Sequence, residues 1–179
     1  MFFGRSPTTT TGRRQVKRTL LWSSALFAVL VGAAFAQDAS APAHVISMPK
    51  DQKWSDPPPV FEKGAQFTLI SGDPSKEGLY VVRLKMPAGY KINPHWHPTD
   101  EHVTVISGSF LVGMGETFDK ATMKELPAGG YVLLPAQMRH YAMAGKKETI
   151  VQVHGMGPFQ LTYVNPADDP STRSTTTTK

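Results

Sequence analysis

The chain has 179 residues, about the length of one domain, and its 40% hydrophobic content suffices for a folded core. It has no Cys, which excludes disulfides, thiolate nucleophiles and every zinc or iron–sulfur site built on Cys. The formal net charge is +5, but five of the nineteen basic residues and no acid stand in residues 1–36. The other fourteen basic residues balance fourteen acidic ones, which argues against a nucleic-acid partner because no clustered basic stripe remains.

Residues 1–36 have the layout of a secretory signal peptide. A basic stretch at 12–18 precedes an apolar run at 20–36, which ends in Ala34-Phe35-Ala36. We expect cleavage after Ala36 and an exported, periplasmic protein with no membrane segment left; the paired Arg13 and Arg14 leave general and twin-arginine export both open. The competing interpretation is an uncleaved anchor, because the run approaches the roughly 20 residues of a membrane span.

Three further regions follow from composition. Residues 37–59 form a small, polar linker that ends in three consecutive Pro, a stretch that is extended and cannot be helical. Residues 165–179 hold too little apolar surface to fold, so we expect a disordered tail. One compact domain remains at 60–164.

Within that domain Gly and Pro recur every 8–12 residues, which favours short strands over helices. The expected strands are 66–70, 79–85, 102–106, 109–113, 131–134, 140–144, 149–154 and 159–164. In the second of them one face carries Tyr80, Val82, Leu84 and Met86 and the other carries Arg83 and Lys85, as in a half-buried strand of an antiparallel sheet. Eight such strands predict an all-β sandwich or small barrel.

The most informative stretch follows the second expected strand. His95 and His97 are two residues apart, so on an extended chain their imidazoles face the same side. Glu101 keeps the same parity beyond a turn-prone Pro-Thr-Asp, and His140 begins a later strand. Imidazoles and a carboxylate that converge in an interior are metal ligands in type. A six-coordinate ion held by these four would keep open positions for catalysis or for a ligand.

The alternative is a pair of ordinary core histidines, because a His-x-His pair is common by chance. The carboxylate, the flanking glycines and the downstream His140 favour a metal. Burial of two imidazoles and a carboxylate without a cation would leave costly unsatisfied polar groups.

Two strings of residues resemble the conserved motifs of the cupin superfamily. The first motif is matched at every defining position by Gly89-x5-His95-x-His97-x3-Glu101-x6-Gly108. The second is matched in part by Gly129-x5-Pro135-x-Gln137-x2-His140-x3-Ala144. Here Gln137 stands where the family usually has Gly, and Ala144 where it usually has Asn. These two departures weaken the analogy with the family's substrates more than they weaken the prediction of metal binding.

The resemblance covers about residues 64–164 and implies an antiparallel jelly-roll barrel. It also implies one metal ion held by His95, His97, Glu101 and His140, as in the small single-domain bacterial cupins. Cupins frequently pair through a sheet face, so a homodimer is the default expectation. The ligand set leaves the divalent ion open among Fe, Mn, Ni and Zn.

The candidates for the wall of a pocket are Tyr131, Met138 and Tyr141 around the second motif, and Gln152 on a later strand. We expect His102 and Arg139 at the surface and Trp96 outside the site, since neither His102 nor Trp96 is in phase with the ligands.

Two functions remain open. The first is a metal-dependent enzyme acting on a small oxygenated molecule, with dioxygenase-, decarboxylase- or isomerase-type chemistry and no catalytic residue assigned. The second is a non-catalytic periplasmic cupin that binds a small ligand or a metal. Cupins host many chemistries on one fold, so the motifs name no reaction.

Overall fold

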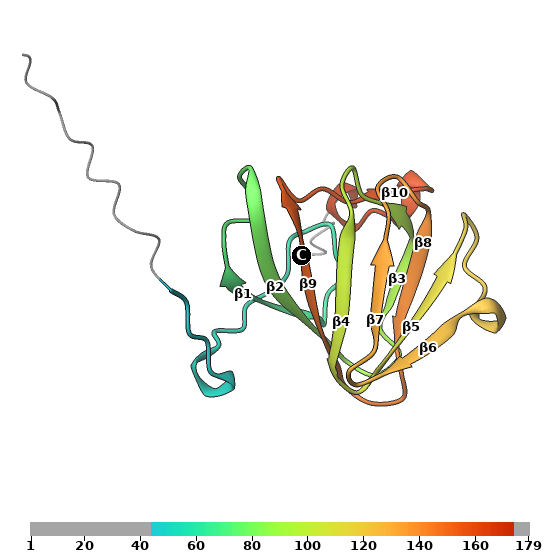
Figure 1. Cartoon of the computed structure of the whole chain (residues 1–179). Coiled ribbons are helices and arrows are strands. Elements are labelled where there is room, and N and C mark those ends of the chain that lie inside the picture. Colours follow the sequence, from blue (N-terminus) through green and yellow to red (C-terminus); the bar gives the residue numbers. More distant parts are fainter. Residues whose placement is uncertain (1–43, 174–179) are drawn as a thin grey trace, which may run out of the picture. The chain divides into compact units, whose positions relative to one another are not determined.

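Ten β-strands form two five-stranded antiparallel sheets in the computed structural model, which describes residues 44–173 (Figure 1). The first sheet, in the order β1-β2-β9-β4-β7, comprises β1 (Gln66–Ser71), β2 (Gly78–Met86), β4 (Glu101–Ser107), β7 (Tyr131–Leu134) and β9 (Thr149–Gly157). The second, in the order β10-β3-β8-β5-β6, comprises β3 (Lys91–Trp96), β5 (Ser109–Met114), β6 (Lys124–Pro127), β8 (His140–Ala144) and β10 (Thr162–Tyr163). Four 3-10 turns complete the described elements: Pro49–Asp51, Lys120–Thr122, Pro166–Asp168 and Pro170–Thr172.

The core lies between the inner faces of the two sheets. Along β2, the expected face of Tyr80, Val82, Leu84 and Met86 is buried, while the side chains between them are less so. Further strands of both sheets contribute buried apolar residues: Val103, Val105, Val151 and Val153 from the first sheet and Ile92, Phe110, Val112 and Ala142 from the second. The prediction of an all-β, antiparallel jelly-roll fold is confirmed.

The expected strands differ from the observed ones at three places. Residues 159–164 keep only β10, and β3 and β6 were not expected as strands. β3 was missed because Asn93 and Pro94 are turn residues by type and Pro lacks the N–H of a strand ladder. The structure accommodates Pro94 where the pairing of β3 with β8 shifts register, between Ile92 and His95.

Residues of the expected linker and of the expected tail make contacts with the domain. Ser55, in the expected linker, pairs with Phe67 of β1. Just after the linker, the carbonyl oxygens of Val60 and Glu62 accept hydrogen bonds from the phenols of Tyr163 and Tyr90. Residues 165–173 form two of the 3-10 turns, and Arg173 makes an ion pair with Glu62 at 2.6 Å. The contacts of Val60 with Tyr163 and of Glu62 with Arg173 join residues more than a hundred positions apart, which composition does not register.

The expected signal peptide at 1–36, with its cleavage after Ala36, lies outside the described residues. Between residues 44 and 173, no helix is long and apolar enough to cross a membrane.

Candidate metal centre

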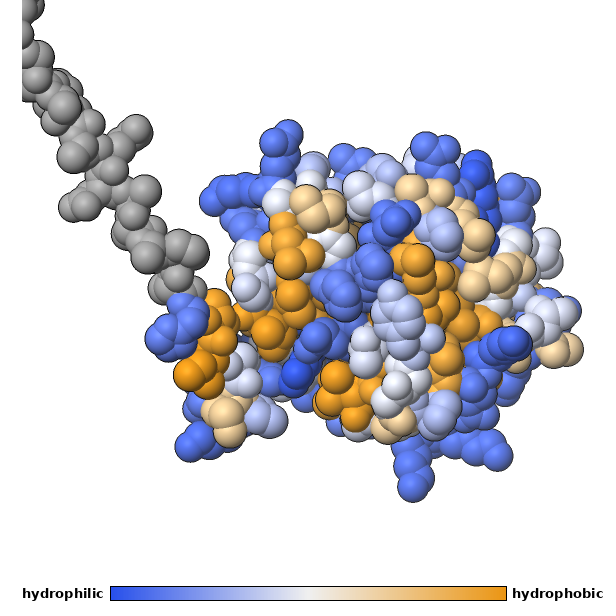
Figure 2. Space-filling model, in the orientation of Figure 1, coloured by the Kyte–Doolittle hydropathy of each residue, from blue (hydrophilic) through white to orange (hydrophobic). Residues whose placement is uncertain are grey.

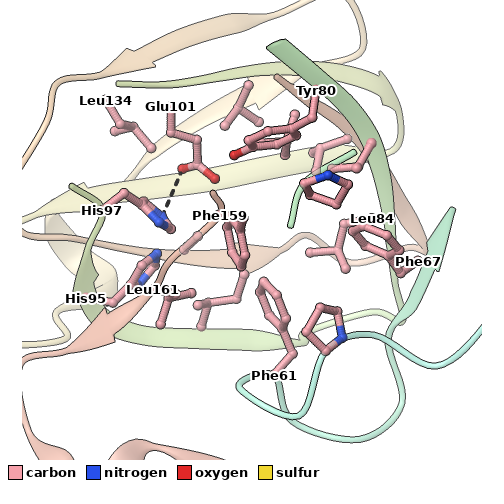
Figure 3. A pocket seen from close by; sticks show the side chains of 18 of the residues that line it. Phe61, Phe67, Tyr80, Leu84, His95, His97, Glu101, Leu134, Phe159 and Leu161 are labelled. Carbon is pink, nitrogen blue, oxygen red and sulfur yellow. Dashed lines mark ion pairs between the residues drawn. The ribbon is translucent and has the colours of Figure 1, made fainter. Parts of the chain in front are cut away.

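The three histidines and Glu101 come from three strands that the two sheets bring together. His95 lies on β3 and pairs directly with His140, the first residue of β8. His97 follows the end of β3 and keeps the parity of His95. Glu101 begins β4 in the opposite sheet. All three imidazoles are at least 94% buried, and Figure 3 shows His95, His97 and Glu101 facing the same cavity.

Backbone carbonyls fix the orientation of each imidazole. The Nδ1 atom lies 2.7 Å from Asn93 O in His95, 2.6 Å from Gln160 O in His97 and 2.9 Å from Met138 O in His140. A carbonyl oxygen only accepts hydrogen bonds, so each Nδ1 must carry the proton when the ring is neutral. The Nε2 lone pair of each ring is then free, which is the arrangement of histidines that bind metals.

The free Nε2 atoms converge on one point. A ligand atom from each of the three rings lies within 4.8 Å of the others. Among the described residues, the buried Nε2 atoms of His97 and His140 have no hydrogen-bond partner. Glu101 Oε2 lies 3.5 Å from both, too far for a strong hydrogen bond (Figure 3, which marks the His97 contact). Two buried lone pairs and a carboxylate thus face one point, and a cation at that point would satisfy all three.

The pKa values of His95 and Glu101 are shifted in the directions that favour cation binding. Burial, and then the neighbouring His140 and His97, lower the pKa of His95 to about 3, so this ring is neutral at neutral pH. Burial acts to raise the pKa of Glu101, but His97 and His140 outweigh it and bring the pKa to about 2. One carboxylate and three imidazoles suit a divalent first-row transition ion, so the donor set fits the metal that the sequence predicts.

The site lies at one end of an apolar cavity of about 280 Å³ (Figure 3). Aromatic and aliphatic side chains make up most of its wall, including Phe61, Phe67, Leu84, Leu134, Phe159 and Leu161. Besides the four candidate ligands, the polar residues that line it within the described chain are Tyr80 and Ser75. A small molecule with an apolar body and an oxygen-bearing head matches this division of the wall.

Residues 42–160 match the family described as the ChrR Cupin-like domain. The chain belongs to this cupin family. No curated protein has significant similarity to its sequence.

Solved structures share the fold of this cupin at low sequence identity. The polyketide cyclase RemF from Streptomyces resistomycificus has a TM-score of 0.60 and 15% identity, over 72% of this chain and 91% of its own. A candidate acetylacetone dioxygenase from Methylibium petroleiphilum PM1 has a TM-score of 0.56 and 22% identity, over 73% and 88%. An RmlC-like cupin from Ralstonia eutropha JMP134 has a TM-score of 0.53 and 22% identity, over 68% and 73%. At these identities the likeness shows the fold alone.

None of the four pocket candidates lines the cavity of this cupin. Tyr141 is one residue out of phase with His140, and its hydroxyl contacts Thr122 and the carbonyl of Asp119 on the other side of the sheet. Gln152 lies on β9 between the inward Val151 and Val153, and it accepts hydrogen bonds from Arg83. Tyr131 and Met138 are 51% and 41% exposed. Proximity to a motif in sequence was the wrong criterion, because parity decides which side of the sheet a residue faces.

The expected surface positions lie outside the cavity. His102 contacts the Tyr131 hydroxyl at 2.7 Å and stacks on His154, with ring centroids 4.9 Å apart. Arg139 lies over Trp96 and 3.7 Å from Glu116, so it does not reach the cavity.

Sequence reasoning missed two kinds of cavity residue. Tyr80 was placed on the inner face of its strand but was treated as core, although an inward tyrosine brings a polar hydroxyl with it. Pro58 comes from the expected linker and Phe61 from the first residues of the expected domain, whereas Phe159 and Leu161 come from an irregular segment after β9. Only the two apolar residues on either side of Gln160 could have hinted at the burial of this segment.

Proposed function

We propose that this cupin is a metal-dependent enzyme that acts on a small oxygenated molecule through dioxygenase-, decarboxylase- or isomerase-type chemistry. One observation carries the proposal: three oriented imidazoles with free Nε2 atoms meet a buried carboxylate at the end of an apolar cavity. A site that served only to stabilise the barrel would need no cavity beside it.

His95, His97, Glu101 and His140 would hold one divalent ion, Fe, Mn, Ni or Zn. Such an ion polarises a carbonyl or enolate oxygen and, if it is redox-active, activates dioxygen. The protein itself orients the ligands and shields the site from water. The three carbonyls that hold the Nδ1 atoms keep the rings in place, and the aromatic wall excludes water from the oxygen-bearing end of the ligand.

The fold neighbours guide the choice of first substrates. A polyketide cyclase and a candidate acetylacetone dioxygenase are named for activities on small molecules rich in ketone oxygens. The apolar wall and the small volume of the cavity support molecules of the same kind, such as neutral 1,3-dicarbonyls and phenols, as substrates to test first.

A specific observation favours a second candidate, a non-catalytic cupin that binds a small ligand or a metal. Apart from the four candidate ligands, Tyr80 is the one titratable residue among those that line the cavity in the described chain. Many enzymes place a separate acid or base beside the reacting atoms. Saturable binding without product would therefore fit this site as well.

Turnover measurements separate the two candidates. The purified protein is loaded in turn with each of the four metals and incubated with 2,4-pentanedione or catechol, while dioxygen uptake and products are followed. The enzyme predicts uptake or product with at least one metal, abolished by chelation and by His97→Ala. The matched control, His102→Ala on the outer face, should keep full activity. Binding of these compounds without product, for every metal, contradicts the enzyme and favours the binding protein.

We also propose that the protein is exported to the periplasm, as the basic and apolar layout of residues 1–36 predicts. Mass spectrometry of the protein from a periplasmic extract tests this, with Gln37 as the expected first residue. Recovery of the intact chain in the cytoplasm would contradict it.

A homodimer through the outer face of the first sheet is part of the proposal. Side chains that alternate with buried ones on β2, β4, β7 and β9 leave large apolar residues 40–61% exposed: Leu79, Ile106, Tyr131, Leu133 and Met156. Figure 2 shows hydrophobic surface between hydrophilic residues on one face of the molecule. Light scattering should give twice the mass of one chain, and Leu133→Glu should halve it; a monomeric wild type contradicts the dimer.

A further inference from the structure

Tyr80, Gly155 and Glu101 form one row across the first sheet. Tyr80 on β2 pairs with Gly155 on β9, and Gly155 pairs in turn with Glu101 on β4. Adjacent strands lie about 4.8 Å apart, so the outer two residues of the row start about 10 Å apart at their backbones. The side chains of Tyr80 and Glu101 both face the cavity.

The glycine in the middle of the row lets the tyrosine reach across. A Cβ at Gly155 would lie 3.0 Å from the Tyr80 hydroxyl oxygen and 3.4 Å from Cζ, so the phenol occupies the space a side chain would fill. Figure 3 shows the Tyr80 hydroxyl turned toward the Glu101 carboxylate. A phenol hydroxyl carries its proton at neutral pH, so Tyr80 can donate a hydrogen bond. A donor is thus held beside the candidate metal ligands.

The charged residues that line the cavity limit the charge that a bound ligand can carry. No Lys or Arg is among the described residues that line the cavity, and Glu101 is its one acid. A divalent ion with Glu101 and three neutral imidazoles would carry one net positive charge. A head with one negative charge or none would leave the buried site neutral or singly charged. A second negative charge would be buried without a partner, which is costly.

We propose that the cavity binds a molecule with an apolar body and an oxygen-bearing head of at most one negative charge, and that the Tyr80 hydroxyl donates a hydrogen bond to an oxygen of that head. This inference rests on the proposed function, because the head must reach the metal beside Glu101. Phosphorylated compounds, dicarboxylates and sugar acids are excluded as ligands. The Tyr80 hydroxyl favours ligands that have an oxygen acceptor beside Glu101.

Two probes of similar size test the class of ligand. 2-Hydroxyacetophenone has an aromatic body and two adjacent oxygens, and phthalate has the same ring with two carboxylates. Both are titrated calorimetrically into the zinc-loaded protein, in which redox turnover is absent. We expect 2-hydroxyacetophenone to bind at least tenfold more tightly than phthalate. Equal or tighter binding of phthalate, or no binding of 2-hydroxyacetophenone to the metal-loaded protein, overturns the inference.

Two variants test Tyr80. Tyr80→Phe removes only the hydroxyl and should weaken 2-hydroxyacetophenone by about fivefold to tenfold, the value of one hydrogen bond, with metal content unchanged. Tyr131→Phe makes the same chemical change on the outer face, where the side chain is 51% exposed, and should leave the affinity within twofold. An unchanged affinity in Tyr80→Phe overturns the role of the hydroxyl.

A measurement on the wild type covers the case in which Tyr80→Phe does not fold. The chain has five Tyr, and 3-fluorotyrosine in all five gives five fluorine resonances, assigned by Tyr→Phe changes at the other four. The Tyr80 resonance should shift on addition of 2-hydroxyacetophenone, and a resonance that stays in place overturns its role.

The metal content of the same samples distinguishes a failure of the proposed function from a failure of this inference. A protein without metal refutes the proposed function and this inference together, whereas a loaded protein with the wrong ligand preference refutes the inference alone.

Discussion

The Nδ1 atom of His97 lies 2.6 Å from the carbonyl oxygen of Gln160, between two residues of the cavity wall, Phe159 and Leu161. The segment that closes the cavity therefore also orients a candidate metal ligand. Phe159 packs against the His97 ring, with centroids 5.6 Å apart, and against Phe61 at 6.1 Å. The cavity wall and the candidate ligand His97 are therefore coupled through the contacts of Phe159 and Gln160.

Phe159→Ala should weaken metal binding as well as the fold. We expect a loss of about tenfold in metal affinity, as for residues that support a ligand, and about 2–3 kcal/mol of stability, less than a fully buried Phe because Phe159 is half-buried. Competition with a chromophoric chelator and urea unfolding measure the two. Phe118→Ala is the matched control, because Phe118 packs on Tyr141 outside the cavity. Equal metal affinity in both variants would contradict the coupling.

Removal of the metal should lower the thermal stability. Metal that binds only the folded protein stabilises it by about 2.7 kcal/mol at a free concentration 100 times Kd, which corresponds to about 10 °C in Tm for a domain of this size. The structural reason is the unpartnered Nε2 atoms of His97 and His140 beside the Glu101 carboxylate. Differential scanning fluorimetry with zinc and with a chelator tests it. His97→Ala should show little shift, and an equal shift in that variant would argue for binding elsewhere.

Gly155→Ala should destabilise the protein through Tyr80. The new methyl group would lie 3.0 Å from both the Tyr80 hydroxyl and the Asp100 carbonyl oxygen, so we expect a loss of about 1–3 kcal/mol. In a Tyr80→Phe background one of these two contacts is gone, and the loss should shrink by about 0.5 kcal/mol or more. A double-mutant cycle by urea unfolding measures the difference. Strict additivity would mean that the phenol does not lie across Gly155.

The stacked pair His102 and His154 predicts a pH effect on the outer face. Burial, and then the nearby His102, lowers the pKa of His154 below the ordinary 6.5. The unfolded chain then binds the proton more readily than the folded protein. The contribution of His154 to stability is therefore full above pH 6.5 and is lost as pH falls from there through the folded pKa. NMR titration should place His154 below 6.5 and should raise its pKa in His102→Gln. A value at or above 6.5 in the wild type would refute this.

The fold and the candidate ligands were largely predictable from the sequence, because both depend on local patterns. The alternation in β2 defined its buried face, and the spacing of His95, His97 and Glu101 gave their shared parity. The wall of the cavity was not predictable from such patterns. Tyr80 meets Glu101 only because two strands pair with β9 on either side of Gly155, and Phe61 reaches the cavity through hydrogen bonds made by distant tyrosines.

A departure from the second cupin motif shows the same limit. Gln137 stands where the superfamily usually has Gly, and the structure keeps it in the left-handed conformation, with φ of 62°. Its N–H donates to the carbonyl oxygen of His97 at 2.7 Å, so the turn holds its geometry without the glycine. The departure therefore leaves the candidate metal ligands in place, at a conformational cost of about 1–2 kcal/mol for a residue with a side chain.

The most direct test of this account is the metal content of the protein, purified without added metal and without a metal-binding tag, beside the His95→Ala/His97→Ala double variant. The account predicts about one equivalent of Fe, Mn, Ni or Zn in the wild type and almost none in the variant, with the β-sheet circular dichroism of the two unchanged. A wild type that holds no metal and takes none up on reconstitution would contradict it.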